Sequence, residues 1–253
     1  MLDIPNIRAI IYDAGFTLIS PHLPIQAVSL LICDRFGITA DPDSFKDALA
    51  LAQGKFVAVQ KEDAQIWASE AAIRQLWTDY YAMALRQSGI DVPSTVVGAC
   101  AGAIYDEYAK HEYWRAYSDA EETLAEGKRR GYIQGVVSDW GVQLPAILHQ
   151  LGLTKYLDFV VVSSLVGVAK PNPRIFELAL SRAEVKSHEA IYVGDSYHTD
   201  IIGARAAGMN PVFLDRDGLH RNLDCPIVGS LGEVLKLANQ GQTAGDRQNV
   251  SGS

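Results

Sequence analysis

The sequence contains few cysteines and no long apolar run. Cys33, Cys100 and Cys225 are odd in number, far apart and without a CxxC pair, which excludes a disulfide framework or a cysteine metal site. We therefore interpret them as buried free thiols in a reducing compartment. No apolar run approaches the ~20 residues that a membrane span requires. The first residues also lack the basic-then-apolar order of a signal peptide. These features predict a soluble, cytoplasmic protein without a membrane partner.

Positive charge is scarce as well. Lys and Arg number 22 against 30 Asp and Glu, which gives a formal net charge of −8. This balance argues against nucleic acid or an anionic membrane as the main partner. The chain has 253 residues, of which 48% are hydrophobic, enough for one large domain or for a core with an inserted smaller domain. We expect a monomer or a homodimer.

One short apolar stretch leads directly into polar residues. Ala9-Ile10-Ile11-Tyr12 is followed by Asp13, then by Gly15 and Thr17. Such a run is typical of a strand buried on both faces of a parallel sheet. Asp13 would then lie at the carboxyl end of the strand, where open α/β sheets bind their ligands. Taken alone, this aspartate is a nucleophile, a metal ligand or the cap of the following turn.

The next part of the chain is helical in pattern. Apolar spacing predicts helices over 25–37, 45–59, 66–89 and 95–108, and no strand. The third of these carries an aromatic stripe that predicts a helix–helix packing face or a ring that lines a substrate pocket. This segment is therefore expected to form a small helical domain.

From residue 117 onward, strand and helix patterns alternate. Ser118 with Glu121 predicts a capped helix, and Asn172 before Pro173 predicts another. Strands are predicted over 132–137, 157–162, 190–193 and 211–214. This alternation predicts an α/β fold with a doubly wound, parallel, Rossmann-like sheet. The last residues, 240–253, have the polar composition of a disordered tail.

Polar side chains follow four of the predicted strands. They are Asp13 with Thr17, then Ser138, then Lys170, and finally Asp195 with Asp200. Because the carboxyl ends of parallel strands open on one edge, we expect these groups around one crevice. Clustered carboxylates repel one another, and a Mg²⁺ ion with oxygen ligands would relieve that repulsion. Lys170 and Ser138 would bind the oxygens of a phosphoryl group.

Four ordered motifs carry a family resemblance. They are Asp13-x-x-x-Thr17, Val136-Val137-Ser138-Asp139, Gly167-Val168-Ala169-Lys170-Pro171 and Gly194-Asp195-Ser196-x-x-x-Asp200. Together they resemble the haloacid-dehalogenase-like (HAD) hydrolase superfamily, over about residues 7–238. The inserted helices resemble the all-helical cap of subfamily I. The resemblance implies a core of 1–18 and 113–239, with a cap of 19–112.

The resemblance also implies roles for single residues. Asp13 would be the nucleophile that forms a covalent aspartyl intermediate, and Lys170 would pair with it and with the phosphate. Thr17 and Ser138 would hydrogen-bond the transferred group. Asp195 would bind Mg²⁺ with support from Asp200.

Gly15 departs from the family pattern. Phosphatases of the family carry there a second aspartate that protonates the leaving group, whereas glycine offers only its backbone carbonyl to the metal. Loss of a general acid removes about 10²–10⁴-fold in rate for a poor leaving group. Asp139 stands where relatives often have asparagine, and it is either an outward loop residue or an additional charge near the site.

Three functions fit this pattern. The first is a Mg²⁺-dependent phosphohydrolase for a small phosphorylated metabolite, with an activated phosphate as one option. The second is a 2-haloacid dehalogenase with a cap arginine, for which Arg35, Arg74 and Arg86 are available. The third is a catalytically weak protein that binds a phosphorylated ligand or a protein partner. In each case the loops around 20–23 and 54–61 are expected to select the ligand.

Overall fold

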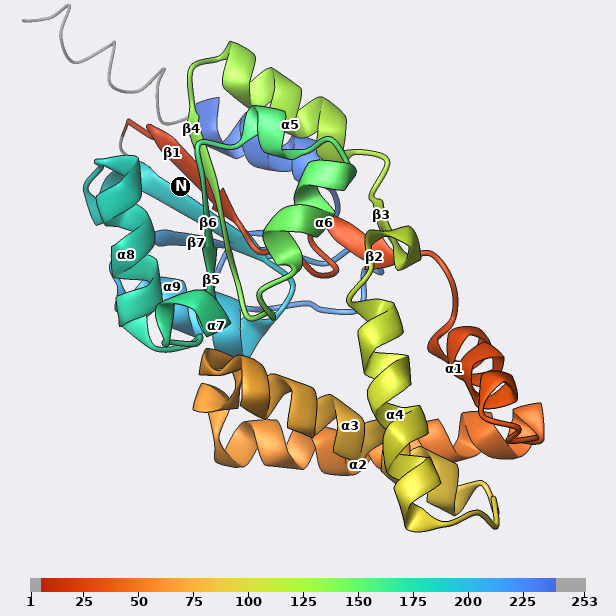
Figure 1. The fold of residues 1–253 in the computed structure, drawn as a ribbon. Helices are drawn as coiled ribbons and strands as arrows, with labels where there is room; N and C mark the ends of the chain where they lie inside the picture. Colours follow the sequence, from red (N-terminus) through yellow and green to blue (C-terminus); the bar gives the residue numbers. More distant parts are fainter. Residues whose placement is uncertain (1–5, 240–253) are drawn as a thin grey trace, which may run out of the picture.

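A six-stranded parallel sheet lies at the centre of the computed structural model, which describes residues 6–239 (Figure 1). Its strands are β1 (Ala9–Tyr12), β4 (Ile133–Ser138), β5 (Phe159–Val162), β6 (Ala190–Gly194), β7 (Asn210–Leu214) and β8 (Ile227–Val228). Their order across the sheet is β5-β4-β1-β6-β7-β8, and every neighbouring pair is parallel. The predicted α/β fold with a doubly wound parallel sheet is confirmed. The tail predicted over 240–253 lies outside the described residues.

Helices cover both faces of this sheet. One face packs against α5 (Ala120–Arg129), α6 (Leu144–Gln150) and a helix over 231–239. The other packs against α8 (Pro173–Ala183) and α9 (Ile202–Ala206). Side chains of β1 alternate between the two apolar layers, which is why its unbroken apolar run has no polar residue. None of the helices described for residues 6–239 combines the length and apolar character that a membrane crossing needs.

A second group of helices lies beyond one end of the sheet (Figure 1). It comprises α1 (Ile25–Arg35), α2 (Pro42–Glu62), α3 (Glu70–Gln87) and α4 (Ser94–Tyr108). These helices share an apolar core of their own, in which Phe56, Trp77, Tyr80 and Tyr81 pack ring against ring. Part of the aromatic stripe therefore forms the packing face that the sequence predicts.

The prediction that this region has no strand is wrong. β2 (Ile19–Pro21) and β3 (Trp114–Ala116) form an antiparallel pair where the chain enters and leaves the helical group. Each strand has only three residues and finds its partner about ninety positions away, so neither carries a local periodic signal. The predicted helix over 66–89 is also interrupted. A 3-10 helix over Ala64–Ala68 precedes α3, and the Ser69 hydroxyl caps α3 by accepting from the Ala72 amide.

The two predicted helix caps have different outcomes. The Asn172 side chain accepts from the Arg174 amide at the start of α8, as predicted. The capping box of Ser118 and Glu121 is wrong, because α5 begins after Asp119 and has no side-chain cap. The Asp119 carboxylate instead accepts hydrogen bonds from Arg216 and from the Leu231 amide. The residue that precedes α5 thus bonds to distant parts of the chain and does not cap the helix.

Two of the cysteines lie side by side within the helical group. The Cys33 and Cys100 sulfur atoms are 3.8 Å apart, and both residues are buried as free thiols. Cys225 is also a free thiol but is only partly buried, which corrects the prediction that all three are buried.

Candidate active site

The predicted polar residues meet at the carboxyl edge of four neighbouring strands. Asp13 follows β1, Ser138 ends β4 and Asp195 follows β6. Lys170 lies in the loop that leads from α7 (Ser163–Val166), next to β5, into α8. These side chains and that of Asp200 line one cavity of about 350 Å³. The topology explains the convergence, since adjacent parallel strands present their carboxyl ends side by side.

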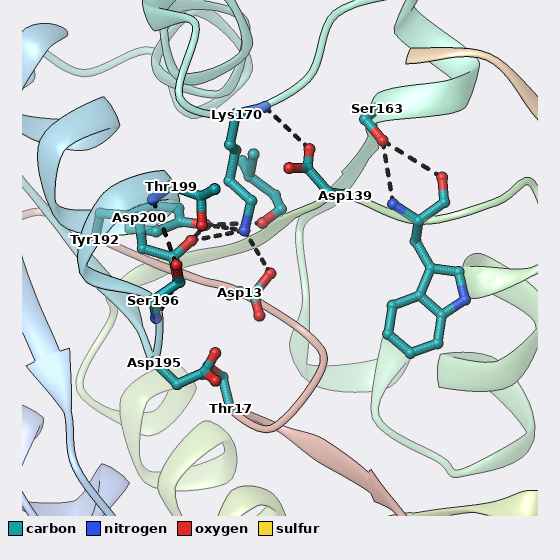
Figure 2. A network of polar contacts seen from close by, with 12 residues as sticks. Asp13, Thr17, Asp139, Ser163, Lys170, Tyr192, Asp195, Ser196, Thr199 and Asp200 are labelled. Carbon is teal, nitrogen blue, oxygen red and sulfur yellow. Dashed lines mark hydrogen bonds and ion pairs between the residues drawn. The ribbon is translucent and has the colours of Figure 1, made fainter. Parts of the chain in front are cut away.

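Lys170 is held between two carboxylates (Figure 2). Its Nζ lies 2.8 Å from Asp13 Oδ1 and 2.6 Å from Asp200 Oδ1, and the lysine is only 4% exposed. Burial alone would lower the pKa of Lys170, but the charges of Asp13 and Asp200 hold that pKa well above its ordinary value. Lys170 therefore remains a cation that touches Asp13 directly.

Three carboxylates form a cluster around this lysine. Asp13, Asp195 and Asp200 each offer an oxygen, and these oxygens lie within 4.8 Å of one another. Burial raises the pKa of Asp13, and burial together with the charges of Asp13 and Asp200 raises the pKa of Asp195 to about 7. Several negative groups thus share a site that one lysine does not fully neutralise. Hard carboxylate oxygens at this spacing are suited to Mg²⁺.

The carboxylates differ in how free their oxygens are. Asp200 Oδ1 accepts a hydrogen bond from Lys170 Nζ, and Asp200 Oδ2 accepts one from the Ser196 amide at 2.9 Å. Among the described residues, Asp195 accepts one hydrogen bond from another side chain, a long one of 3.5 Å from the Thr17 hydroxyl. Asp13 and Asp195 are therefore the better placed direct ligands for a cation, whereas Asp200 orients Lys170 and the loop after β6.

Thr17 lies apart from the cavity itself. It is fully buried, and its hydroxyl points to Asp195 at 3.5 Å (Figure 2). It is absent from the residues that line the cavity in the described part of the chain. In this arrangement the Thr17 hydroxyl lies beside Asp195, and its hydrogen bond to a transferred group stays a prediction.

Gly15 faces the indole of Trp140. A Cβ atom placed on Gly15 would lie 2.9 Å from Trp140 Cζ3, closer than two carbon atoms normally approach. The hydrogen bonds of the turn run from the Phe16 amide to the Ile19 carbonyl and from the Leu18 and Ile19 amides to the Ala14 carbonyl. The turn thus leaves the Gly15 carbonyl free for a cation, and the indole fills the place of a side chain at residue 15.

One polar residue near the site, Tyr192, was not among those predicted, and Asp139 was predicted only as one of two alternatives. The Tyr192 hydroxyl lies 2.9 Å from the Val137 carbonyl and 3.2 Å from Asp200 Oδ1, and it accepts from Lys170 Nζ at 3.4 Å. Tyr192 lies within an apolar strand, so the sequence pattern predicts a core residue and gives no sign of its contact with Lys170. Asp139 lines the cavity, and its Oδ1 accepts the Lys170 amide at 3.0 Å. It is therefore the additional charge near the site, not an outward loop residue.

Asp139 gives a pH-dependent prediction. Burial raises its pKa to about 7, although Lys170 partly opposes the shift. Because the folded state then holds a proton that the unfolded state releases near pH 4, stability falls as pH rises from about 4 to 7. Relative to the native chain, Asp139→Asn should gain about 1–2 kcal/mol of unfolding free energy between pH 5 and pH 7.5. Urea unfolding in EDTA at the two pH values measures this gain, and an unchanged difference would contradict the assignment.

The opposite wall of the cavity comes from the helical group. Trp67, Ile73, Trp77 and Tyr81 line it from α3 and the segment before it, and Tyr105 and Tyr108 line it from α4. Of the segments expected to select the ligand, Pro21 and Gln60 contribute. The expected loop over 54–61 is wrong, because α2 continues through it as helix, and Pro21 ends β2. Arg35, Arg74 and Arg86 do not line the cavity described for this chain, and Lys170 is its one lysine. The aromatic stripe therefore serves both predicted roles, packing and cavity wall.

Hydrogen bonds join the two walls. The Gln65 side chain donates to the Ala169 carbonyl at 3.3 Å and accepts from the Ala169 amide at 3.2 Å. The Ser163 hydroxyl donates to the Trp67 carbonyl at 2.6 Å, and Glu70 accepts the Val142 amide at 2.8 Å. These contacts connect the start of α3 and the segment before it to α7 and to the loops that carry Lys170 and Trp140.

Comparisons with known proteins agree on one family. Residues 57–214 match the model of the haloacid dehalogenase-like hydrolases. The chain is 30% identical over 210 residues to haloacid dehalogenase-like hydrolase domain-containing protein 3 of Xenopus laevis, covering 81% of this chain and 83% of that protein.

A phosphatase and a dehalogenase are also similar. The chain is 38% identical over 138 residues to the glyceraldehyde 3-phosphate phosphatase of Methanopyrus kandleri. The matched region covers 54% of this chain and 58% of that enzyme. A solved structure described as a dehalogenase superposes with a TM-score of 0.65 at 25% identity, covering 91% of this chain and 96% of that one.

Proposed function

The chain belongs to the haloacid dehalogenase-like hydrolases, and on that premise we propose that it is a Mg²⁺-dependent phosphohydrolase acting on a small phosphorylated metabolite. The observation that carries the proposal is the contact of Asp13 with Lys170 inside a carboxylate cluster at the edge of the sheet. The similarity to a phosphatase supports the same chemistry.

Asp13 is the proposed nucleophile. One of its oxygens attacks phosphorus, the bond from phosphorus to the leaving oxygen breaks, and the electron pair departs with that oxygen. Water then attacks the phosphorus of the aspartyl phosphate, which releases inorganic phosphate and regenerates Asp13. Lys170 holds the reacting carboxylate in place and, with the Ser138 hydroxyl, donates hydrogen bonds to the phosphoryl oxygens.

Asp13 and Asp195 would hold Mg²⁺, together with the Gly15 carbonyl and with Asp200 as their support. The ion would supply positive charge against the carboxylates and the phosphoryl oxygens. The donor set supports this assignment, since all of these atoms are hard oxygens and the cluster carries more negative than positive charge.

We further propose that α1–α4 act as a cap. They supply the aromatic wall of the cavity, and they reach the loops of Lys170 and Trp140 through Gln65 and Glu70. A cap that breaks and reforms these bonds would admit substrate and then exclude bulk water during attack on phosphorus.

The cavity lining weighs against the dehalogenase alternative. That reaction needs a cation for the substrate carboxylate besides the lysine that holds Asp13, and no arginine or histidine lines the cavity in the described part of the chain. The alternative of a binding protein is supported by Gly15, because glycine cannot protonate the leaving group as the aspartate of the family's phosphatases does. Direct assay separates the three functions.

The test is an assay of the purified chain with phosphate esters, an acyl phosphate and 2-chloropropionate, each with Mg²⁺ and with EDTA. We expect phosphate release that needs Mg²⁺. Chloride release that persists in EDTA would instead support a dehalogenase. The absence of both activities would support the binding protein.

A further inference from the structure

Aromatic side chains dominate the cavity beside Asp13. Phe16 and Trp140 come from the loops after β1 and β4, while Trp77, Tyr81 and Tyr108 come from α3 and α4. The cavity of about 350 Å³ is larger than the ~150 Å³ that holds a benzene ring in an apolar protein interior. It therefore has room for a phosphoryl group and a ring. The Tyr108 hydroxyl is buried without a hydrogen-bond partner among the described residues, so it offers a ring substituent one polar contact.

Phe16 is the most informative of these residues. It has a left-handed backbone with φ of 56°, a conformation that is unfavourable for a side chain of this size. The residue is 55% exposed, so it adds little to the buried core. The hydrogen-bonded turn accounts for this backbone conformation, since the Phe16 amide donates to the Ile19 carbonyl. The turn does not require a large apolar ring, and contact with a ligand explains why such a ring lies exposed beside the nucleophile.

The charges of the cavity point to a neutral leaving group. Its one lysine is already paired with Asp13 and Asp200, and the lining of the described chain holds no arginine or histidine. A second phosphate or a carboxylate on the leaving group would meet no free cation there. It would also lie near the carboxylates of Asp139 and Asp195.

The environment of residue 15 points to an acidic leaving group. The Trp140 indole fills the place of a side chain on Gly15, so no carboxyl group at that position protonates the departing oxygen. A phenol has a pKa near 10, whereas the pKa of an alkanol is several units higher, close to that of water. A phenolate therefore leaves far more readily than an alkoxide when no proton is supplied.

We propose that the preferred substrates are aryl phosphates, that is, phosphate monoesters of phenols whose ring lies among these aromatic side chains. The inference rests on the proposed function. Asp13 displaces the phenolate, the electron pair of the broken bond stays on the phenolate oxygen, and that oxygen takes its proton from solvent. Water then hydrolyses the aspartyl phosphate, so the products are one phenol and one inorganic phosphate.

Binding is tested first, without chemistry. Calorimetry with Mg²⁺ compares phenylphosphonate with ethylphosphonate, neither of which can be hydrolysed at its carbon–phosphorus bond. We expect phenylphosphonate to bind at least about 10-fold tighter, because its ring is buried in the cavity. Equal affinities, or no binding of phenylphosphonate, would overturn the inference whether or not the chain hydrolyses any ester.

Turnover then separates ring binding from leaving-group acidity. Phenyl phosphate and 2-phenylethyl phosphate both carry a ring, but only the first releases a phenol. We expect KM values within a few-fold of each other and a kcat at least about 100-fold higher for phenyl phosphate. Comparable kcat values would show that another group, such as Asp139, protonates the leaving oxygen, and would overturn the inference while leaving the phosphohydrolase intact.

Phe16 provides a variant with little risk to folding. Because the ring is exposed, Phe16→Leu should retain the melting temperature and weaken phenylphosphonate binding about 5-fold or more, with little change for ethylphosphonate. Phe16→Tyr keeps the ring and should bind like the native chain. An unchanged phenylphosphonate affinity in Phe16→Leu would contradict the role of this ring.

Discussion

Replacing Asp13 with asparagine is expected to abolish phosphate release, with a fall in kcat on the order of 10⁴-fold or more. Asparagine keeps the shape of the side chain but has no anionic oxygen to attack phosphorus. Residual turnover would come only from Lys170, Ser138 and the bound cation acting on water. The measurement is phosphate release in Mg²⁺ by the native chain and by Asp13→Asn at the same substrate concentration.

A matched control comes from an aspartate outside the cavity. Asp217 is exposed beyond β7 and does not line the site, so Asp217→Asn should retain full activity. Asp13→Asn should also keep a cooperative unfolding transition, because Lys170 retains Asp200 as a partner. Turnover by Asp13→Asn within 10-fold of the native rate would contradict the assignment of Asp13 as nucleophile.

Replacing Lys170 with methionine is expected to destabilise the chain by about 3–5 kcal/mol at pH 8 in EDTA. The substitution preserves length but leaves Asp13 and Asp200 buried without their cation. At pH 5 the loss should be smaller, because burial raises the pKa of Asp13 and protonation of Asp13 removes part of the uncompensated negative charge. Chemical unfolding at the two pH values measures the difference.

An exposed lysine serves as the control for Lys170→Met. Lys155 pairs with Glu121 at 3.0 Å, but both side chains are more than half exposed. Lys155→Met should therefore change the unfolding free energy very little. Added Mg²⁺ should recover part of the loss in Lys170→Met if the carboxylates hold the ion. Equal effects of the two substitutions would contradict a buried charge cluster.

The sheet could be predicted from the sequence because its signals are local. The apolar runs before Asp13, Ser138 and Asp195 are long enough to mark buried strands, and each ends in a polar residue. Parallel pairing then brings those ends together without further information. This is why the cluster around Lys170 is found where the pattern predicts it.

The features that were missed depend on distant partners. β2 and β3 are three-residue strands that exist because they pair with each other. The Asp119 carboxylate accepts hydrogen bonds from Arg216 and from the Leu231 amide. Both partners lie about a hundred positions further along the chain, so the residues next to Asp119 do not predict these bonds. Tyr192 reads as an apolar strand residue until its hydroxyl is seen beside Lys170.

The relation between Gly15 and Trp140 is of the same kind. The sequence shows that an acid is missing at residue 15, but not that an indole 125 positions later occupies its place. It follows that Gly15→Asp alone would not restore the family's usual arrangement, because the new side chain meets the ring. The ring of Trp140 both lines the cavity and occupies the place where a carboxylate on residue 15 would lie.

The central claim is that Asp13 carries the phosphoryl group. The most direct test mixes the native chain with phenyl phosphate and Mg²⁺ in ¹⁸O-labelled water, quenches in acid during turnover, and analyses peptides and phosphate by mass spectrometry. We predict one phosphoryl group on the peptide that contains Asp13, with the label in released phosphate and none in the carboxylate. Label in the Asp13 carboxylate, a phosphoryl group on another residue, or no phosphate release would contradict the account.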